Sequence, residues 1–164
     1  LNHAGVELRL NTRITRIDGN RIKFDAGQDI MAATIVVTTG MRANPLTAGF
    51  GLALDAAGRL PVDRYLAVNG LSDVHASGDV AHAMTDERHL ALMSCQHAMP
   101  MGRHAGHNAA AALLGLSPHP YRQERYVTCL DLGPWGAVFT NGWDRQVEAI
   151  EQEAKSRKRS INGE

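Results

Sequence analysis

The segment Val74-His-Ala-Ser-Gly-Asp79 has the pattern of a short strand that ends on a glycine and an aspartate. A glycine at the carboxyl end of a strand lets a ligand approach the backbone closely, because it carries no side chain. The adjoining carboxylate can accept hydrogen bonds from ligand hydroxyls at the edge where open α/β sheets bind their ligands. An ordinary Gly-Asp turn has the same sequence, so the surroundings decide whether Gly78 and Asp79 form a site.

A long helix is predicted downstream of this segment, within residues 94–114. The stretch is rich in alanine, and Gly115 follows it as a helix stop. Pro100 lies near the start of the stretch. The helix therefore either bends at this proline or begins after it, and we favour the bend.

The first forty residues have β character. Residues 6–10 alternate apolar and charged side chains, as in a half-buried strand. A hairpin over residues 14–24 is predicted to turn at Asp18-Gly-Asn20 and to continue into a further strand at residues 30 and 31. Residues 35–39 (Ile-Val-Val-Thr-Thr) form a continuous β-branched run, which is typical of a strand buried on both faces of a parallel sheet.

The rest of the chain alternates turn-rich and regular stretches. Residues 42–71 contain many turn residues and predict an extended crossover with a small hairpin at residues 55–58. After the linker Ser117-Pro-His-Pro120, strands are predicted at residues 126–130 and 137–140. A final helix is predicted over about residues 148–160.

Two segments together resemble the flavoprotein reductases that contain two dinucleotide-binding domains. Residues 37–45 (Val-Thr-Thr-Gly-Met-Arg-Ala-Asn-Pro) are similar to the point where the chain of that family leaves the NAD(P)H domain. Residues 71–81 are similar to its later FAD motif, and the resemblance implies that Asp79 contacts the ribityl-phosphate region of the flavin, with Gly78 beside it. It also implies three residues near the nicotinamide: Gly40, Met41 and Arg42.

Residues 94–102 (Ser-Cys-Gln-His-Ala-Met-Pro-Met-Gly) narrow the resemblance to type II NADH dehydrogenases. There, an Ala-Gln-x-Ala-x-x-Gln-like run at a helix start lies beside the isoalloxazine and the quinone. The run is matched at positions 96 and 98, whereas a cysteine and a proline stand at positions 95 and 100. A helix start also favours the negative charge of a reduced flavin, through its free N–H groups. The resemblance therefore implies that three residues face the isoalloxazine with their backbone: Gln96, His97 and Ala98.

The fold that this resemblance implies is α/β, as the C-terminal portion of a flavoprotein with two dinucleotide-binding domains. The expected parts are the end of the NAD(P)H domain (residues 1–40), the returning strand and helix of the FAD domain (41–117) and a small C-terminal α+β unit (118–164). No Gly-x-Gly-x-x-Gly follows a predicted strand. Both cofactor sites are therefore expected to be incomplete here, with the phosphate-binding loops on a missing N-terminal half, and the chain alone is expected to be inactive.

Composition and charge disfavour several other classes of protein. Seventeen basic residues balance seventeen acidic ones, so there is no field to attract nucleic acid. No apolar run approaches the roughly 18–20 residues that a membrane crossing needs. Cys95 and Cys129 form no Cys-x-x-Cys pair and the histidines no His-Glu-x-x-His, so neither disulfide chemistry nor a metal site is expected. We expect a cytoplasmic protein, with peripheral contact to the inner face of the cell membrane or to a quinone in the intact protein.

The expected function is that of an NADH dehydrogenase-like oxidoreductase, which passes hydride from NAD(P)H to FAD and electrons on to a quinone or another acceptor. No side chain is expected to act as a proton-transfer catalyst. One alternative is a non-catalytic, β-rich interaction module, supported by the absent glycine motif and the β unit over residues 126–139. Another is an enzyme of the ferredoxin- or rubredoxin-reductase kind. The aromatic residues of that β unit, Trp135 among them, also suggest a homodimer interface.

Overall fold

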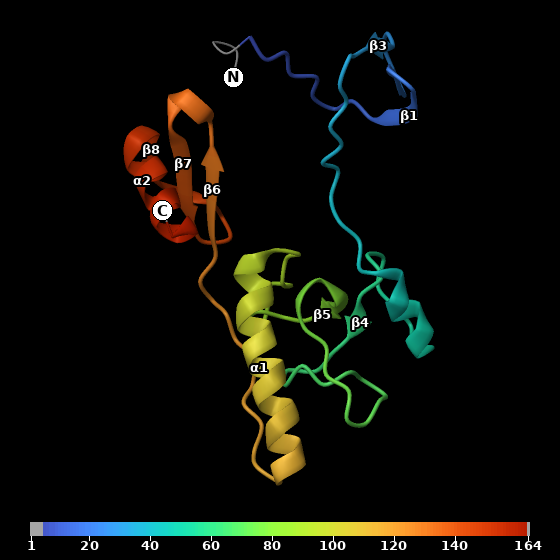
Figure 1. Cartoon of the computed structure of the whole chain (residues 1–164), viewed down its shortest axis with the longest axis vertical. Coiled ribbons are helices and arrows are strands. Elements are labelled where there is room, and N and C mark those ends of the chain that lie inside the picture. The colour runs from blue at the N-terminus through green and yellow to red at the C-terminus, as the bar shows by residue number, and fades with distance from the viewer. Residues whose placement is uncertain (1–4, 164) are drawn as a thin grey trace. The chain divides into compact units, whose positions relative to one another are not determined.

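The computed structural model describes residues 5–163, and the chain divides into two compact units, Leu1–Gly40 and Met41–Glu164, which are treated separately below. The first unit is an antiparallel sheet of three short strands, drawn in blue in Figure 1: β1 (Ile14–Asp18), β2 (Arg21–Phe24) and β3 (Ile30–Met31). Ile17 pairs with Ile22 across a turn in which Gly19 has a φ of 58°. The predicted hairpin and its continuation into β3 are confirmed.

Two other strands predicted for this unit are absent. Residues 6–10 have no regular structure and are exposed. Residues 35–39 also form no strand, and Val36 is 79% exposed. A strand exists only when a neighbouring strand satisfies its backbone groups, and no strand of the described residues pairs with either stretch.

The second unit begins with short elements that lead to α1. They are a 3-10 helix η2 (Pro45–Phe50), strand β4 (Leu60–Pro61), a 3-10 helix η3 (Gly78–Val80) and strand β5 (Ala81–His82), which pairs parallel with β4. The small hairpin predicted at residues 55–58 is only a turn without flanking paired strands, closed by the hydrogen bond from Gly58 N–H to the Asp55 carbonyl. The strand predicted at residues 74–77 is wrong, because only His75 forms an isolated bridge, to Ala67. This extended segment is too short for a ladder, and Gly78 turns it into η3.

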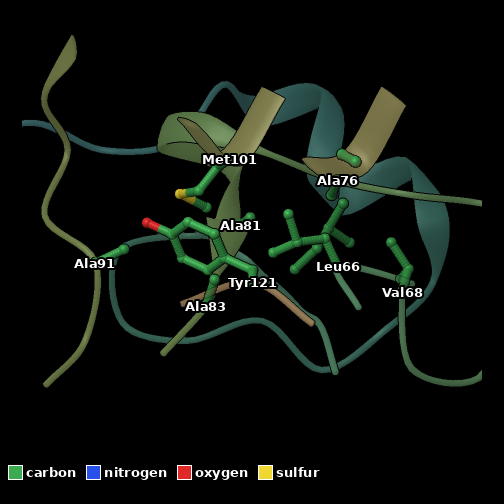
Figure 2. Packing of buried hydrophobic residues seen from close by; sticks show 10 residues of the cluster. Leu66, Val68, Ala76, Ala81, Ala83, Ala91, Met101 and Tyr121 are labelled. Carbon is green, nitrogen blue, oxygen red and sulfur yellow. The ribbon is translucent and has the colours of Figure 1, made fainter. Parts of the chain in front are cut away.

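Helix α1 (Cys95–Leu114) confirms the predicted helix, and Gly115 ends it in the left-handed conformation. The helix begins before Pro100 and continues through it, so a start after the proline is excluded. Its buried face helps to form the main core, in which Met101 of α1 and Tyr121 meet Ala81 and Ala83 (Figure 2). Small side chains at these positions let the helix and the loops around β5 lie close together.

The C-terminal part of the second unit is a three-stranded antiparallel sheet covered by one helix, drawn in orange and red in Figure 1. Its elements are β6 (Val127–Asp131), a 3-10 helix η4 (Gly133–Trp135), β7 (Ala137–Asn141), β8 (Gln146–Ile150) and α2 (Glu151–Asn162). Phe139, Ala149 and Ala154 form a second, smaller core. The two predicted strands are confirmed, but residues 148–150 belong to β8 rather than to the final helix. The second unit is thus mixed α/β with small sheets.

Candidate functional site

The Gly78-Asp79 motif lies against the first turn of α1. Gly78 has a φ of +69°, a conformation that favours glycine, and a Cβ added there would lie 3.4 Å from the Ala98 Cβ. Asp79 follows within η3 and is exposed, and among the described residues its carboxylate makes no hydrogen bond. Gly78 therefore lies against Ala98, which comes twenty residues later in the sequence. The expected role of Gly78, Asp79 and Ala98 toward a cofactor stays a prediction.

The side chain of Gln96 is engaged by the C-terminal sheet rather than free for a ligand. Its Nε2 donates to the Val127 carbonyl (2.9 Å), and its Oε1 accepts from the Val127 N–H (3.0 Å). The amide thus pairs with the start of β6 in the way that a neighbouring strand would. Only the backbone of Gln96 can face a ligand at the helix start.

Pro100 leaves the backbone carbonyl of Gln96 free for a second contact with the C-terminal part of the chain. Because proline has no N–H, the carbonyl oxygen of Gln96 loses the partner that an α-helix would give it. Gln123 supplies the replacement, since its Nε2 donates to that oxygen at 3.0 Å. Gln123 is itself held by the Tyr121 hydroxyl, which donates to its Oε1 at 2.9 Å. The segment that precedes β6 is therefore fastened to the first turns of α1.

His97 is fully buried, with its ring turned into the protein interior. A hydrogen bond joins its Nδ1 to Ser94 Oγ (3.0 Å), and the ring packs against Tyr126 and Trp143, each 5.8 Å away between centroids. Burial lowers the pKa of His97, because it disfavours the charged form of the ring. Its Nε2 and the Trp143 Nε1 find no partner among the described residues. The residue as a whole has no exposed surface, and its N–H donates to the Ser94 carbonyl, so neither the ring nor the N–H of His97 is free for a ligand.

The helix start retains open hydrogen-bond donors. Ser94 stands at the N-cap position but makes no side-chain cap. The N–H groups of His97 and Ala98 both donate to the Ser94 carbonyl. The two preceding N–H groups, of Cys95 and Gln96, have no acceptor among residues 5–163. Open N–H groups at the positive end of a 20-residue helix favour an anion or an electron-rich oxygen.

The three residues expected near the nicotinamide lie where the two units meet in sequence. Gly40, with a φ of +108°, ends the first unit, and Met41 and Arg42 begin the second. All three are exposed. Met41 and Arg42 share the second unit with Asp79, whereas Gly40 belongs to the first. No observation tests contact of these residues with a nicotinamide, so the expectation for all three stays a prediction.

Two carboxylate–histidine pairs lie outside this cluster, and the sequence analysis did not single them out. Asp55 accepts from Arg59 Nε (2.6 Å) and pairs with His82 Nδ1 (2.8 Å). Burial raises the pKa of Asp55, but the hydrogen bonds from the Arg59 N–H, His82 and the Arg59 guanidinium outweigh it and hold that pKa well below its usual range. Asp86 pairs with His89 Nδ1 (2.7 Å), and the His89 ring stacks on Trp143 at 4.4 Å.

Two open hollows lie near the second pair, of about 410 and 330 Å³. Their walls share Asp86, Glu87 and Arg122, and neither wall includes Asp79 or the start of α1. They are therefore separate from the Gly78–Ala98 cluster. Among the described residues, no group of three or more His, Cys, Asp or Glu is placed to hold a metal ion. Both cysteines are free, and Cys95 is exposed.

Within residues 5–163, neither α1 nor α2 combines the length with the apolar composition that crossing a bilayer requires.

Comparison with known proteins adds to this geometry. Residues 1–102 match the family described as pyridine nucleotide-disulphide oxidoreductase. Two NADH dehydrogenase-like proteins of Mycobacterium tuberculosis, from strains CDC 1551 and H37Rv, are each 44% identical to the chain over 158 residues. The alignments cover 96% of this chain and 40% of each relative, so the chain spans less than half the length of these proteins.

Proposed function

Because the chain belongs to the pyridine nucleotide-disulphide oxidoreductase family, we propose that it forms the later part of an FAD-dependent NAD(P)H oxidoreductase of the NADH dehydrogenase-like kind. FAD accepts hydride from NAD(P)H and releases electrons to an acceptor, a quinone or another molecule. The proposal includes a partner: the N-terminal half of a longer protein, which carries the glycine-rich phosphate loops that this chain lacks. The relatives, of which the chain covers 40%, support this.

The observation that carries the proposal is the open helix start beside Gly78 and Asp79. A flavin ring needs hydrogen-bond donors at its electron-rich edge, and the N–H groups of Cys95 and Gln96 have no acceptor among the described residues. The ribityl chain carries hydroxyl groups that need acceptors, and the exposed Asp79 carboxylate is one. The donor set and the glycine cradle thus fit an FAD molecule that lies across η3 and the first turn of α1.

In this proposal, each residue binds or positions the cofactor rather than transferring protons. Asp79 holds the ribityl hydroxyls, and Gly78 keeps the backbone close to Ala98. The helix start from Gln96 through the buried His97 to Ala98 lies beside the isoalloxazine, with the open N–H of Gln96 as a donor, while the side chains of Gln96 and His97 hold the C-terminal sheet against the helix. Gly40, Met41 and Arg42 remain assigned to the nicotinamide side.

The test is Asp79→Ala in the full-length protein that contains this segment. The ribityl hydroxyls lose a charged acceptor worth about 1.5–3 kcal/mol, so FAD is expected to dissociate about tenfold to a hundredfold more readily. Flavin absorbance per polypeptide after gel filtration measures it.

Asp73→Asn is the control, because Asp73 is an exposed carboxylate just before the motif and asparagine tolerates its φ of 61°. Its flavin content should equal that of the wild type. Undiminished flavin in Asp79→Ala would refute the role of Asp79. Residues 1–164 alone should purify colourless, since they contain no Gly-x-Gly-x-x-Gly. A stoichiometric yellow chromophore on them would show that the phosphate loops are not needed.

A further inference from the structure

The N-cap residue of α1 has its backbone in place for capping, but its hydroxyl is used elsewhere. Ser94 has φ −157° and ψ 153°, the extended conformation of an ordinary N-cap. A serine in that position normally accepts a hydrogen bond from the N–H two or three residues on. Here the hydroxyl instead bonds His97 Nδ1 at 3.0 Å, and no side-chain cap forms.

The partner of this hydroxyl cannot turn away from it easily. His97 is fully buried, and its ring is packed between residues that come about thirty to forty-five positions later, Tyr126 and Trp143. These two rings stack on each other at 4.4 Å and belong to the segment that Gln96 fastens to α1. The C-terminal sheet therefore fixes the imidazole, and the imidazole fixes the serine.

We propose that His97 is a positioning residue, which holds the Ser94 hydroxyl away from the first turn of α1 so that the N–H of Gln96, next to the open N–H of Cys95, stays open for the electron-rich edge of a bound flavin. The identity of the ligand rests on the proposed function. The diversion of the Ser94 hydroxyl rests on the structure alone. A capped helix start would have to give up its serine before it could bind. The uncapped start has its donors ready, which lowers the cost of binding.

The diverted cap is tested in the 164-residue chain without cofactor, by backbone amide hydrogen exchange. In His97→Phe the aromatic packing stays, but the nitrogen that holds Ser94 is gone, so the hydroxyl is expected to cap the helix. The Gln96 amide should then exchange about fivefold more slowly, the effect of an ordinary serine cap. In the double variant Ser94→Ala/His97→Phe this slowing should disappear. Equal Gln96 exchange in wild type and His97→Phe would overturn the proposal.

A second arm covers the case in which His97→Phe does not fold. Ser94→Ala keeps the buried imidazole and removes only the hydroxyl. If that hydroxyl is not a cap, the Gln96 amide should exchange at the wild-type rate relative to amides in the middle of α1. A speeding of about fivefold, as for loss of an ordinary cap, would also overturn the proposal.

The consequence for the flavin is tested in the FAD-loaded full-length protein. His97→Phe should raise the Kd for FAD about fivefold, because the cofactor must displace the new cap, and adding Ser94→Ala should restore it. If His97 only packs the core, removing the Ser94 hydroxyl should not restore FAD affinity in His97→Phe. A Kd of the double variant that stays as high as that of His97→Phe therefore overturns the positioning role. If the exchange results hold but FAD leaves the Cys95 and Gln96 amide signals unshifted, the proposed function fails and the diverted cap stands.

Discussion

Two amide side chains on α1, those of Asn108 and Gln96, form hydrogen bonds to backbone groups outside the helix. Asn108 is buried in α1, where its Nδ2 donates to the carbonyls of Tyr65 and His119 and its Oδ1 accepts from the His119 N–H, all at 2.8 Å. The predicted linker over residues 117–120 is irregular, but it is tied to the helix at this point. Gln96 does the same for the start of β6. Each amide thereby ties irregular or strand-end backbone to α1.

Acid stability is also decided by individual residues, and Asp131 gives a pH-dependent prediction. The Gly133 N–H, together with Lys155 and Lys158, lowers the pKa of Asp131 to about 2. Since this lies below the ordinary value of 3.8, its contribution to stability is full above about pH 4 and is lost as the pH falls toward about 2.

We therefore expect Asp131→Asn to lower the Tm at neutral pH and to converge with the wild type as the pH falls from about 4 to about 2. Thermal unfolding followed by circular dichroism at stepped pH measures this. Asp73→Asn, which removes one exposed carboxylate without such partners, is the control for net charge. A Tm difference between Asp131→Asn and wild type that stays constant to pH 2 would contradict the assignment.

At the scale of elements, close backbone contacts join the pieces of the C-terminal sheet. η4 turns back at Gly136, where φ is +90°, and a Cβ there would lie 2.5 Å from the Glu151 Cα at the start of α2. Backbone atoms cannot yield as a flexible side chain would. Position 136 therefore requires a glycine for two reasons: the backbone has a positive φ, and a side chain would overlap the backbone of Glu151.

Two Gly→Ala substitutions are expected to have opposite effects. Gly136→Ala should lower the free energy of unfolding by about 2–4 kcal/mol, through strain at positive φ and overlap with Glu151. Gly106→Ala in α1 should raise it by about 0.5–1 kcal/mol, because a Cβ there meets nothing within 4 Å and alanine favours a helix. Urea unfolding of both variants measures this. If Gly106→Ala lowered the free energy of unfolding as much as Gly136→Ala, the space around each Cβ would not decide whether the substitution stabilises or destabilises the protein.

At the scale of the whole molecule, an uncharged face of the C-terminal sheet lies open. The inner face packs its apolar residues against α2, and the other side carries Leu130, Val147 and Ile150, each more than half exposed. Trp135 in η4 is 58% exposed as well. The inner face thus covers α2 rather than α1. The sheet meets α1 through Val127 and Trp143 instead.

We propose a second copy of the chain as the partner of this face, since a net charge of zero gives two copies no mutual repulsion. Trp135→Asp and Val147→Asp should each shift the chain toward the monomer in sedimentation velocity, because a carboxylate buried at an apolar interface is costly. Leu113→Asp, at an 89% exposed position on α1, is the control and should leave association unchanged. A wild-type chain that sediments as a monomer at every concentration would remove the interface.

The sequence by itself determined the elements whose signals are local. The hairpin over residues 14–24, α1 with its glycine stop, and strands β6 and β7 follow from side-chain alternation, turn residues and helix-ending residues that lie within a few positions of one another. The family also followed from short motifs read in order.

Only the tertiary structure decided how the site's side chains are used. The partners of Gln96 and His97 stand 27 to 46 residues further along the chain, at Gln123, Val127 and Trp143, and no spacing rule connects them. The β-branched run at residues 35–39 also depends on distant partners, and here the partner is missing among the described residues. Its sequence suits a buried strand, but without a paired neighbour among the described residues it stays exposed, because backbone hydrogen bonds in a sheet need a second strand.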